Sequence, residues 1–461
     1  MSNERQDRNA WLKLNHAQID LVYEFNQGYM DFLNLAKTER ESVDYIVNMA
    51  RINGFVDFDE VKTLVPGQKL IYQLKNKVCA LVVVGEQPLE AGVNIAASHI
   101  DTPRIDLKPR PLYEADGQAL FKTHYYGGIK KYQWLAIPLA LHGVVVKKTG
   151  EKVHIKLGEE AEELVLTIAD LLPHLAKEQM EKKISEAVKG EDLNILVGNR
   201  PLPGVDKEPI KEYIVQILKE KYKIEDDDFT SAELQLVPAF KAREVGLDRS
   251  MIGGYGQDDR VSAYTALKAV LEVDKPKVTA VCLFVDKEEI GSTGNTGLQS
   301  LVLENLIAAL IQKTGSNDYF KVRSCLANSC ALSADVNAAV DPNYPEVFEK
   351  MNCSFMANGV VLTKYTGSRG KAESNDANPE FMAKIRNLFD KNEIVWQVGE
   401  LGKVDIGGGG TVAQYMAWYG MEVVDCGVAV LGMHSPFEVT SKADVFMSYR
   451  AYKEFMQTFT L

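Results

Sequence analysis

The sequence predicts an α/β protein in which helices cover both faces of a sheet and a second domain is inserted into the first. Two observations predict the fold class: strand-like runs stay apolar along their whole length, as strands buried on both faces do, and helical patterns alternate with them. A third observation, a long internal segment of different pattern, predicts the insertion.

The predicted strands are rich in Val, Ile and Ala. They cover residues 78–85 ("VCALVVVG"), 92–98, 278–285 and 422–431. Helical patterns cover residues 41–55, 259–273 and 441–459. Ser441, followed three residues later by Asp444, predicts a capping box at the start of the last helix. Alternating elements of this kind indicate a sheet sandwiched by helices.

The segment from about 104 to 245 breaks this alternation. Its stretch "VVVKKTGEKVHIKL" alternates apolar and polar residues, as a half-exposed strand does, and a charge-rich stretch follows. We therefore expect residues 1–103 and 246–461 to form one domain and residues 104–245 to form the inserted one.

Composition narrows the class of protein. Hydrophobic residues make up 46% and charged residues 25%, as in globular proteins. A net charge of −12 argues against nucleic acid or an anionic membrane as partner, since both require a basic surface. No apolar run reaches the ~20 residues of a membrane span, and no secretory signal begins the chain, so we expect cytoplasmic residence. In that compartment the six cysteines are expected to be reduced and buried.

Two histidines stand directly after apolar strands. His99 lies in "NIAASHIDTPR", where Asp101 falls on the same side of the strand and can orient its ring. His434 lies in "VLGMHSPFEVT", between turn signals. For each, a structural histidine in a hydrogen bond is the alternative.

Acidic residues occupy similar positions. Asp258 and Asp259 stand between a glycine-rich loop and a helix, where a helix N-cap is the alternative. Glu288 and Glu289 follow the strand 278–285, and Asp335 follows a run of small residues. Together these acids and the two histidines favour one shared site.

Hydrolysis by two metal ions would use such a set. Zinc accepts imidazole and carboxylate ligands, and a pair of ions ~3.5–4 Å apart needs one bridging carboxylate. One acid must stay off the metals to take a proton from water. Adjacent glutamates can divide these tasks, because consecutive side chains diverge; Gly291 is expected to end the strand beside them.

Five stretches in this order resemble the aspartyl aminopeptidase and vacuolar aminopeptidase I family: "SHIDTPR", "GQDDR", "DKEEIGS", "SADVNAAVDPNY" and "GMHSPFE". The resemblance implies a zinc exopeptidase type of α/β domain with a mixed sheet and a smaller, β-rich dimerisation domain inserted after the first metal histidine. It also implies two divalent ions per subunit, peptide substrates with a free N-terminus, and a homo-oligomer of twelve subunits built from dimers.

The resemblance also implies a role for each residue. Asp258 would bridge the metals, His99 and Asp335 would complete one site, and Glu289 with His434 the other. Glu288 would be the general base, and Asp101 would orient His99. The ions are expected to be Zn²⁺, although the donor set also suits Co²⁺ or Mn²⁺.

Several alternatives stay open. Lys364, nearest the family's pocket lysine, is the tentative substrate residue beside Arg369 and Lys371, but acidic and neutral N-terminal preferences are equally compatible with it. Gly407–Gly410 either lets backbone approach the substrate or forms a mobile loop. A binuclear deacylase or carboxypeptidase, and a non-catalytic shell or cargo-binding relative, are the rival functions.

Overall fold

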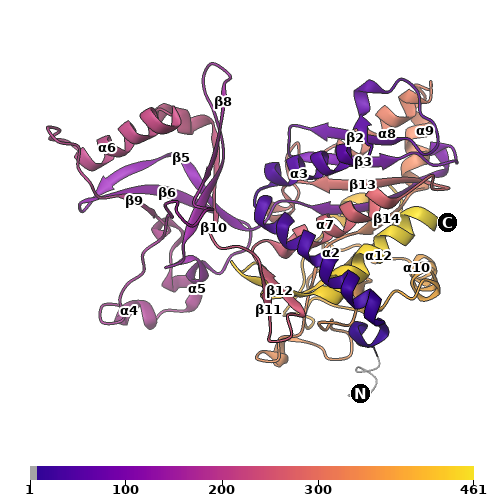
Figure 1. The fold of residues 1–461 in the computed structure, drawn as a ribbon. Helices are drawn as coiled ribbons and strands as arrows, with labels where there is room; N and C mark the ends of the chain where they lie inside the picture. The colour runs from indigo at the N-terminus through magenta and orange to yellow at the C-terminus, as the bar shows by residue number, and fades with distance from the viewer. Residues whose placement is uncertain (1–7) are drawn as a thin grey trace. The chain divides into compact units, whose positions relative to one another are not determined.

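The computed structural model describes residues 8–461, and these form two compact units (Figure 1). The larger unit comprises the described residues up to Asp101 with Ala242–Met433 and Glu438–Leu461. The smaller unit comprises Thr102–Lys241 and His434–Phe437. The predicted α/β fold class with an inserted smaller unit is therefore confirmed.

A nine-stranded mixed sheet forms the centre of the larger unit, in the order β1-β2-β3-β13-β4-β14-β18-β16-β17. Strands β4, β13, β14 and β18 run parallel to one another. β3 runs antiparallel to β2 and β13, and β16 runs antiparallel to β18 but parallel to β17. The strand bounds are β1 Val56–Asp57, β2 Lys69–Leu74, β3 Val78–Val83, β4 Val93–His99, β13 Thr279–Val285, β14 Cys330–Ser333, β16 Val360–Thr363, β17 Trp396–Val398 and β18 Glu422–Gly427.

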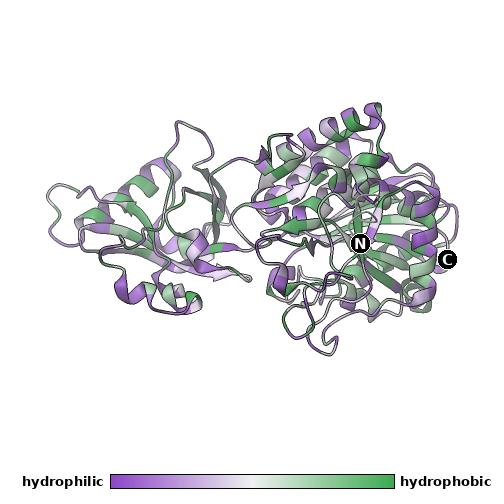
Figure 2. Ribbon diagram, turned by 90° about the horizontal axis from the view of Figure 1, so that it is seen from below, coloured by the Kyte–Doolittle hydropathy of each residue, from purple (hydrophilic) through white to green (hydrophobic). Residues whose placement is uncertain are grey.

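Helices cover both faces of this sheet, because alternate side chains of its strands point to opposite sides. In β13, Phe284 packs into the core beneath one layer, and its neighbour Leu283 into the core beneath the other. The strands of the larger unit are coloured mainly as hydrophobic, whereas its helices combine hydrophobic and hydrophilic residues (Figure 2). The first layer contains α3 Glu39–Ile52, α7 Gln257–Glu272, α10 Pro379–Lys391 and α12 Lys442–Thr458; the second contains α8 Val302–Lys313, α9 Tyr319–Ala327 and α11 Ala413–Ala417. Helix α2, His16–Leu35, packs outside α7 and α12.

A second sheet of the larger unit has the order β11-β12-β20-β19-β15. Its strands are β11 Arg243–Val245, β12 Met251–Gly254, β15 Asn337–Ala338, β19 Ala429–Leu431 and β20 Glu438–Ser441. The run 422–431, predicted as one strand, is divided at Val428 into β18 of the large sheet and β19 of this one. Uniform apolar character conceals the change of sheet, since both halves are buried.

The predicted capping box at α12 is wrong. Ser441 precedes the helix but makes no capping hydrogen bond with its side chain. The carboxylate of Asp444 instead accepts the backbone N–H groups of Ala357 and Gly359, each at 2.7 Å. A distant loop therefore uses the acceptor that the local pattern assigned to the helix start.

The smaller unit contains an antiparallel sheet in the order β8-β7-β10-β5-β6-β9. Its strands are β5 Arg104–Ala115, β6 Gln118–Tyr126, β7 Leu139–Val146, β8 Lys152–Leu157, β9 Ile195–Gly198 and β10 Ala232–Pro238, and its helices are α4 Lys177–Met180, α5 Ile184–Ala187 and α6 Pro209–Ile217. The alternating run 144–157 is a hairpin of β7 and β8 rather than one strand, and Gly150 turns it with φ of 86°. The insertion is therefore β-rich.

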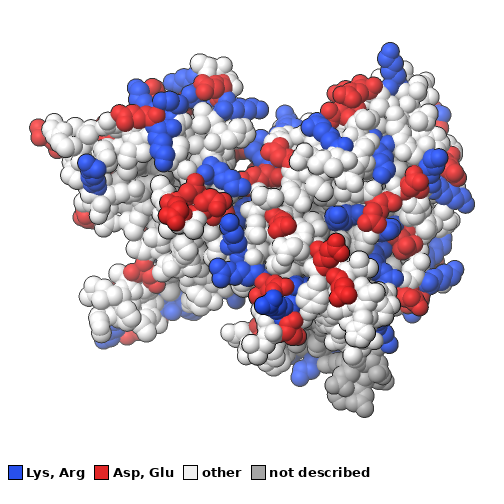
Figure 3. All heavy atoms as spheres, viewed as in Figure 1, with Lys and Arg blue, Asp and Glu red and all other residues white. Residues whose placement is uncertain are grey.

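All six cysteines are buried and free, as predicted. Among residues 8–461, no helix is long and apolar enough to cross a membrane. On the face seen in Figure 3, acidic and basic side chains are interspersed.

Candidate metal centre

Three parallel strands of the large sheet bring predicted ligands to one edge. β4 ends at His99, which is aligned with Val285 at the end of β13. β14 ends at Ser333, aligned with Ala97 of β4. Glu288 and Glu289 follow β13, and Asp335 follows β14. Because carboxyl ends of adjacent parallel strands meet at one edge, segments far apart in sequence converge there.

Asp258 reaches this edge from the second sheet, at the junction of β12 and α7. Glu438, the first residue of β20, accepts the backbone N–H groups of Gln257 at 2.5 Å and Asp258 at 3.1 Å. Gly256 has φ of 69°, and a Cβ there would lie 1.6 Å from a terminal nitrogen of buried Arg260. α7 is kinked at its start: Asp258 (φ −81°, ψ 105°) and Asp259 (φ −118°, ψ 29°) have non-helical backbone angles, so the regular helix begins after them and the capping alternative stays a prediction.

Donor atoms of the predicted ligands lie close enough to share a cation. Nε2 of His99 is 3.2 Å from Oδ1 of Asp258 and 3.9 Å from Oε2 of Glu288. Within the larger unit, two sets offer one donor atom per residue with these atoms all within 4.8 Å of one another: His99 with Glu288 and Glu289, and His99 with Asp258 and Asp335. Five predicted site residues are thus brought together within the larger unit, whereas Asp259 belongs to no such set among the described residues.

The electrostatics of this cluster call for positive charge. Burial raises the pKa of Asp335 well above its usual value; nearby His99 opposes the shift, while Glu288 and Asp258 increase it further. Burial lowers the pKa of His99, but hydrogen bonds to Asp101 and Asp258 outweigh this and leave the pKa well above its usual value. Carboxylates held this close together retain protons, because their negative charges repel each other. A divalent cation that binds them displaces these protons. The residues therefore fit zinc.

Asp101 connects the histidine to the glutamates. Nδ1 of His99 lies 3.0 Å from the backbone carbonyl oxygen of Asp101 and 3.3 Å from its carboxylate. Since a carbonyl oxygen only accepts, Nδ1 carries the hydrogen, and Nε2 is left to face Asp258. The Asp101 carboxylate also accepts the backbone N–H groups of Glu288 at 3.1 Å and Glu289 at 3.2 Å. Sequence spacing pointed to the first contact but missed the second.

The paired glutamates lie on a turn rather than on a strand. β13 ends at Val285, and Glu288–Ile290 form a 3₁₀ turn that begins after Lys287, at φ of 69°. Gly291, at φ of 85°, ends this turn and not the strand, so that prediction is wrong. Two left-handed residues around the turn set where the two carboxylates point.

His434 lies in the connection between the paired strands β19 and β20. Its backbone has φ of 65°, and its Nδ1 lies 2.8 Å from the carbonyl oxygen of Gly128. That contact again leaves Nε2 as the acceptor nitrogen. Residues 434–437 belong to the smaller unit, so the role of His434 as a ligand stays a prediction.

The tentative substrate residue is already ion-paired. The ammonium of Lys364 contacts the carboxylate of Asp376, and Nζ of Lys371 lies 2.9 Å from the other oxygen of that carboxylate. Thr411, directly after the glycine run, donates to buried Asp425 at 2.7 Å. That bond fixes one end of the glycine loop to β18, and local sequence carried no signal for it.

A helix-covered mixed sheet with a histidine and carboxylates at the ends of its central parallel strands defines a metal-dependent hydrolase of the zinc peptidase kind. The family model "Aminopeptidase I zinc metalloprotease (M18)" matches residues 32–456. The chain belongs to this family, and the predicted metalloaminopeptidase is confirmed.

Relatives support this assignment over nearly the whole chain. The probable M18 family aminopeptidase 1 of Clostridium acetobutylicum is 48% identical over 457 residues, covering 98% of each chain. Its namesake from Thermotoga maritima is 46% identical, again over 98% of each chain. The crystal structure of the Thermotoga maritima M18 aminopeptidase matches with a TM-score of 0.94 at 45% identity, covering 98% of this chain and 99% of that one.

Proposed function

We propose that the protein removes single N-terminal residues from peptides with two divalent metal ions, most simply Zn²⁺. The convergence of His99, Asp258, Asp335, Glu288 and Glu289 at one sheet edge carries this proposal. In it, Asp258 would hold both ions, His99 and Asp335 would complete one site, and Glu289 and His434 would complete the other. Support for His434 comes from Glu438, four residues on, which binds the backbone of Asp258.

The ions, when bound, polarise the scissile carbonyl and lower the pKa of water toward neutrality. Glu288, half-buried beside His99, accepts the proton from the attacking water and returns it to the leaving amine. Asp101 keeps the Nδ1–H form of His99 in place and holds the backbone of the glutamate turn. Glu289 binds metal, so the neighbours have separate tasks.

Matched amide substitutions of the neighbours test this division. Glu288→Gln should lower kcat by about 10²–10⁴-fold, because only proton transfer is lost, and should keep its metal content. Glu289→Gln makes the same chemical change one residue on and should lose metal. Equal metal loss in both variants, or an undiminished rate in Glu288→Gln, would refute the assignment.

A free N-terminus is the proposed requirement in the substrate, since an exopeptidase must recognise the α-amine. Cleavage of peptides with free and acetylated N-termini separates this activity from that of a binuclear deacylase or carboxypeptidase. Hydrolysis of the acetylated peptide alone would favour the deacylase. A non-catalytic relative would cleave neither peptide when loaded with zinc, cobalt or manganese.

Assembly and selectivity are further parts of the proposal. We expect a homo-oligomer of twelve subunits built from dimers through the inserted unit; a yeast relative of the same fold, 21% identical, is described as a dodecamer. Light scattering measures the mass. Lys364 is the candidate residue for binding an acidic N-terminal side chain of the substrate. In this proposal, its ammonium group leaves Asp376 when the substrate binds. Cytoplasmic residence stays the expectation for location.

A further inference from the structure

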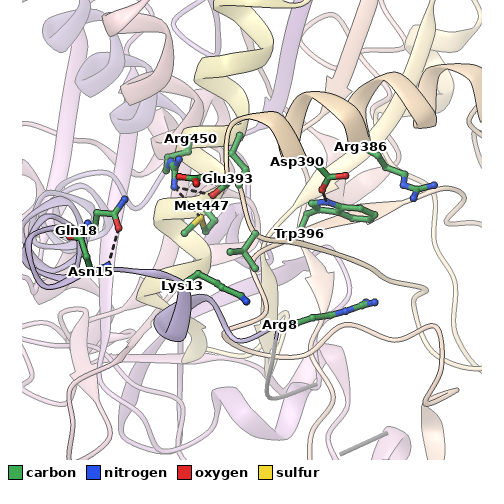
Figure 4. Close-up of a pocket in the computed structure, with 12 residues that line it drawn as sticks. Arg8, Lys13, Asn15, Gln18, Arg386, Asp390, Glu393, Trp396, Met447 and Arg450 are labelled. Atoms are coloured by element: carbon green, nitrogen blue, oxygen red, sulfur yellow. Dashed lines mark hydrogen bonds between the residues drawn. The ribbon is translucent and has the colours of Figure 1, made fainter. Parts of the chain in front are cut away.

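A hollow of about 760 Å³ lies in the larger unit, and none of the predicted metal ligands lines it. Figure 4 shows the residues that do. It is lined by residues from the segment before α2, from α10, from β17 and from α12. β17 is the edge strand of the large sheet, three strand spacings of about 4.8 Å from β14. The volume falls within the range of small-molecule sites.

Positive side chains predominate around the hollow. Four cationic residues line it, Arg8, Lys13, Arg386 and Arg450, with two carboxylates, Asp390 and Glu393. Arg450 is committed to the end of α10, where it donates to the backbone carbonyls of Asn392 at 2.7 Å and Glu393 at 3.2 Å. Asp390 accepts the indole N–H of Trp396 at 2.8 Å. These bonds hold the wall together and leave the other three cations to face the hollow.

Arg8 and Lys13 are exposed and make no ion pair with any residue from 8 to 461. In the view of Figure 4 they extend on one side of Trp396, and the carboxylates of Asp390 and Glu393 lie on the other. The guanidinium of Arg386 lies 5.4 Å from the centre of the Trp396 ring. Like charges that share one hollow repel each other, and a bound anion offsets this.

The part of the rim at the start of α2 contributes no carboxylate, so the two carboxylates of the lining are those of Asp390 and Glu393. Asn15 and Gln18 line it at the start of α2, and each accepts the other's backbone N–H, at 3.0 and 2.9 Å. Their side-chain amide oxygens are therefore used in the capping box. The first turn of α2 contains no acidic residue.

We propose that this hollow binds a small phosphate-bearing molecule, with the phosphate between Lys13 and Arg8. Phosphate suits these residues, because it accepts several charge-assisted hydrogen bonds at once. The chemistry is shared by free phosphate and by phosphate monoesters, and a monoester with a planar ring also has Trp396 within the hollow to contact. The site is independent of the proposed two-metal mechanism.

Calorimetric titration of the full-length, metal-loaded protein with inorganic phosphate and with adenosine 5′-monophosphate tests this. We expect saturable binding that weakens with ionic strength, and at least tenfold weaker binding in Lys13→Glu. Lys13→Arg should bind normally, as should Lys384→Glu, an exposed lysine of α10 outside the hollow. Tighter binding of the monophosphate would identify the monoester as the ligand, and equal affinity would identify free phosphate.

Two results would overturn the proposal. One is the absence of saturable heat with either probe. The other is binding that persists unchanged in Lys13→Glu and in Arg8→Glu, since phosphate would then be bound elsewhere, for example at the metals. Peptidase kcat should be the same in both variants as in the unmodified protein, which shows that they remain folded.

Discussion

Asp101→Asn perturbs the residue that connects His99 to both glutamates. The carboxylate accepts two backbone N–H groups, at 3.1 and 3.2 Å, and lies 3.3 Å from Nδ1 of His99. The amide oxygen of asparagine can accept only some of these hydrogen bonds. The NH₂ group of the same side chain is a donor, so it cannot accept the backbone N–H group that faces it. Hydrogen bonds to a charged acceptor contribute about 1.5–3 kcal/mol each, so losing one displaces the glutamate turn.

The expected result is a 10–100-fold loss of zinc affinity or of kcat/KM, typical for a residue that orients a metal ligand. Zinc affinity is measured by competition with a chromophoric chelator, and kcat and KM are measured separately. Asp444→Asn is the matched control, because Asp444 is also buried and accepts two backbone N–H groups, but belongs to none of the metal-ligand sets among the described residues.

The reasoning is refuted if Asp101→Asn retains the zinc affinity and kcat of the unmodified protein. It is also refuted if Asp444→Asn lowers zinc affinity as much, since the effect would then follow from replacing any buried carboxylate that binds backbone N–H groups and not from the position of Asp101. Only a loss confined to Asp101→Asn supports a positioning role.

Three further predictions follow from the site and the core. Removal of metal by 1,10-phenanthroline should abolish peptidase activity and lower Tm, because bound metal stabilises the native state, and adding zinc should restore both; activity that survives full metal loss would contradict the proposal. Burial raises the pKa of Asp444 from 3.8 to about 8, against lowering by the N–H groups of Gly359 and Ala357, so its contribution to stability is present below about pH 4 and is lost as pH rises to about 8. Asp444→Asn should therefore gain stability relative to the unmodified protein over that interval, by up to about 5 kcal/mol in urea unfolding, and a pH-independent difference would disprove the shift. Lys364→Met should lower kcat/KM for N-terminal Asp relative to N-terminal Leu by about tenfold if Lys364 binds acidic side chains, whereas an unchanged ratio removes it from the pocket.

The large sheet was predictable because its strands are buried on both faces. Residues 78–85, 92–98 and 278–285 remain apolar throughout, and each became a central strand within one or two residues of the predicted bounds. The run 422–431 was not resolved into two strands, because apolar character reports burial and not which sheet a residue joins. Hydrogen-bond partners decide that, and they lie elsewhere in the chain.

Hydrogen bonds between side chains and groups far away in the sequence could not be predicted from local sequence patterns. Asp444 matched the spacing of a capping box, yet its carboxylate binds a loop 85 residues away. The motif "GMHSPFE" ends at Glu438, but the sequence pattern predicts no role for this residue. In the structure, its carboxylate accepts the backbone N–H group of Asp258. A capping pattern describes only what is locally available, and tertiary contacts compete for the same acceptor.

The sequence by itself determined the fold class, the membership of the M18 family and the chemical types of the site residues, because each depends on residue identity and order. Tertiary structure decided which of these residues meet. It brought His99, Asp258, Asp335 and the two glutamates to one edge, placed Glu288 and Glu289 on a 3₁₀ turn between two left-handed residues, and made Asp101 an acceptor for their backbone. Strand register and backbone angles set those distances, and both depend on the whole packed sheet rather than on neighbours in the chain.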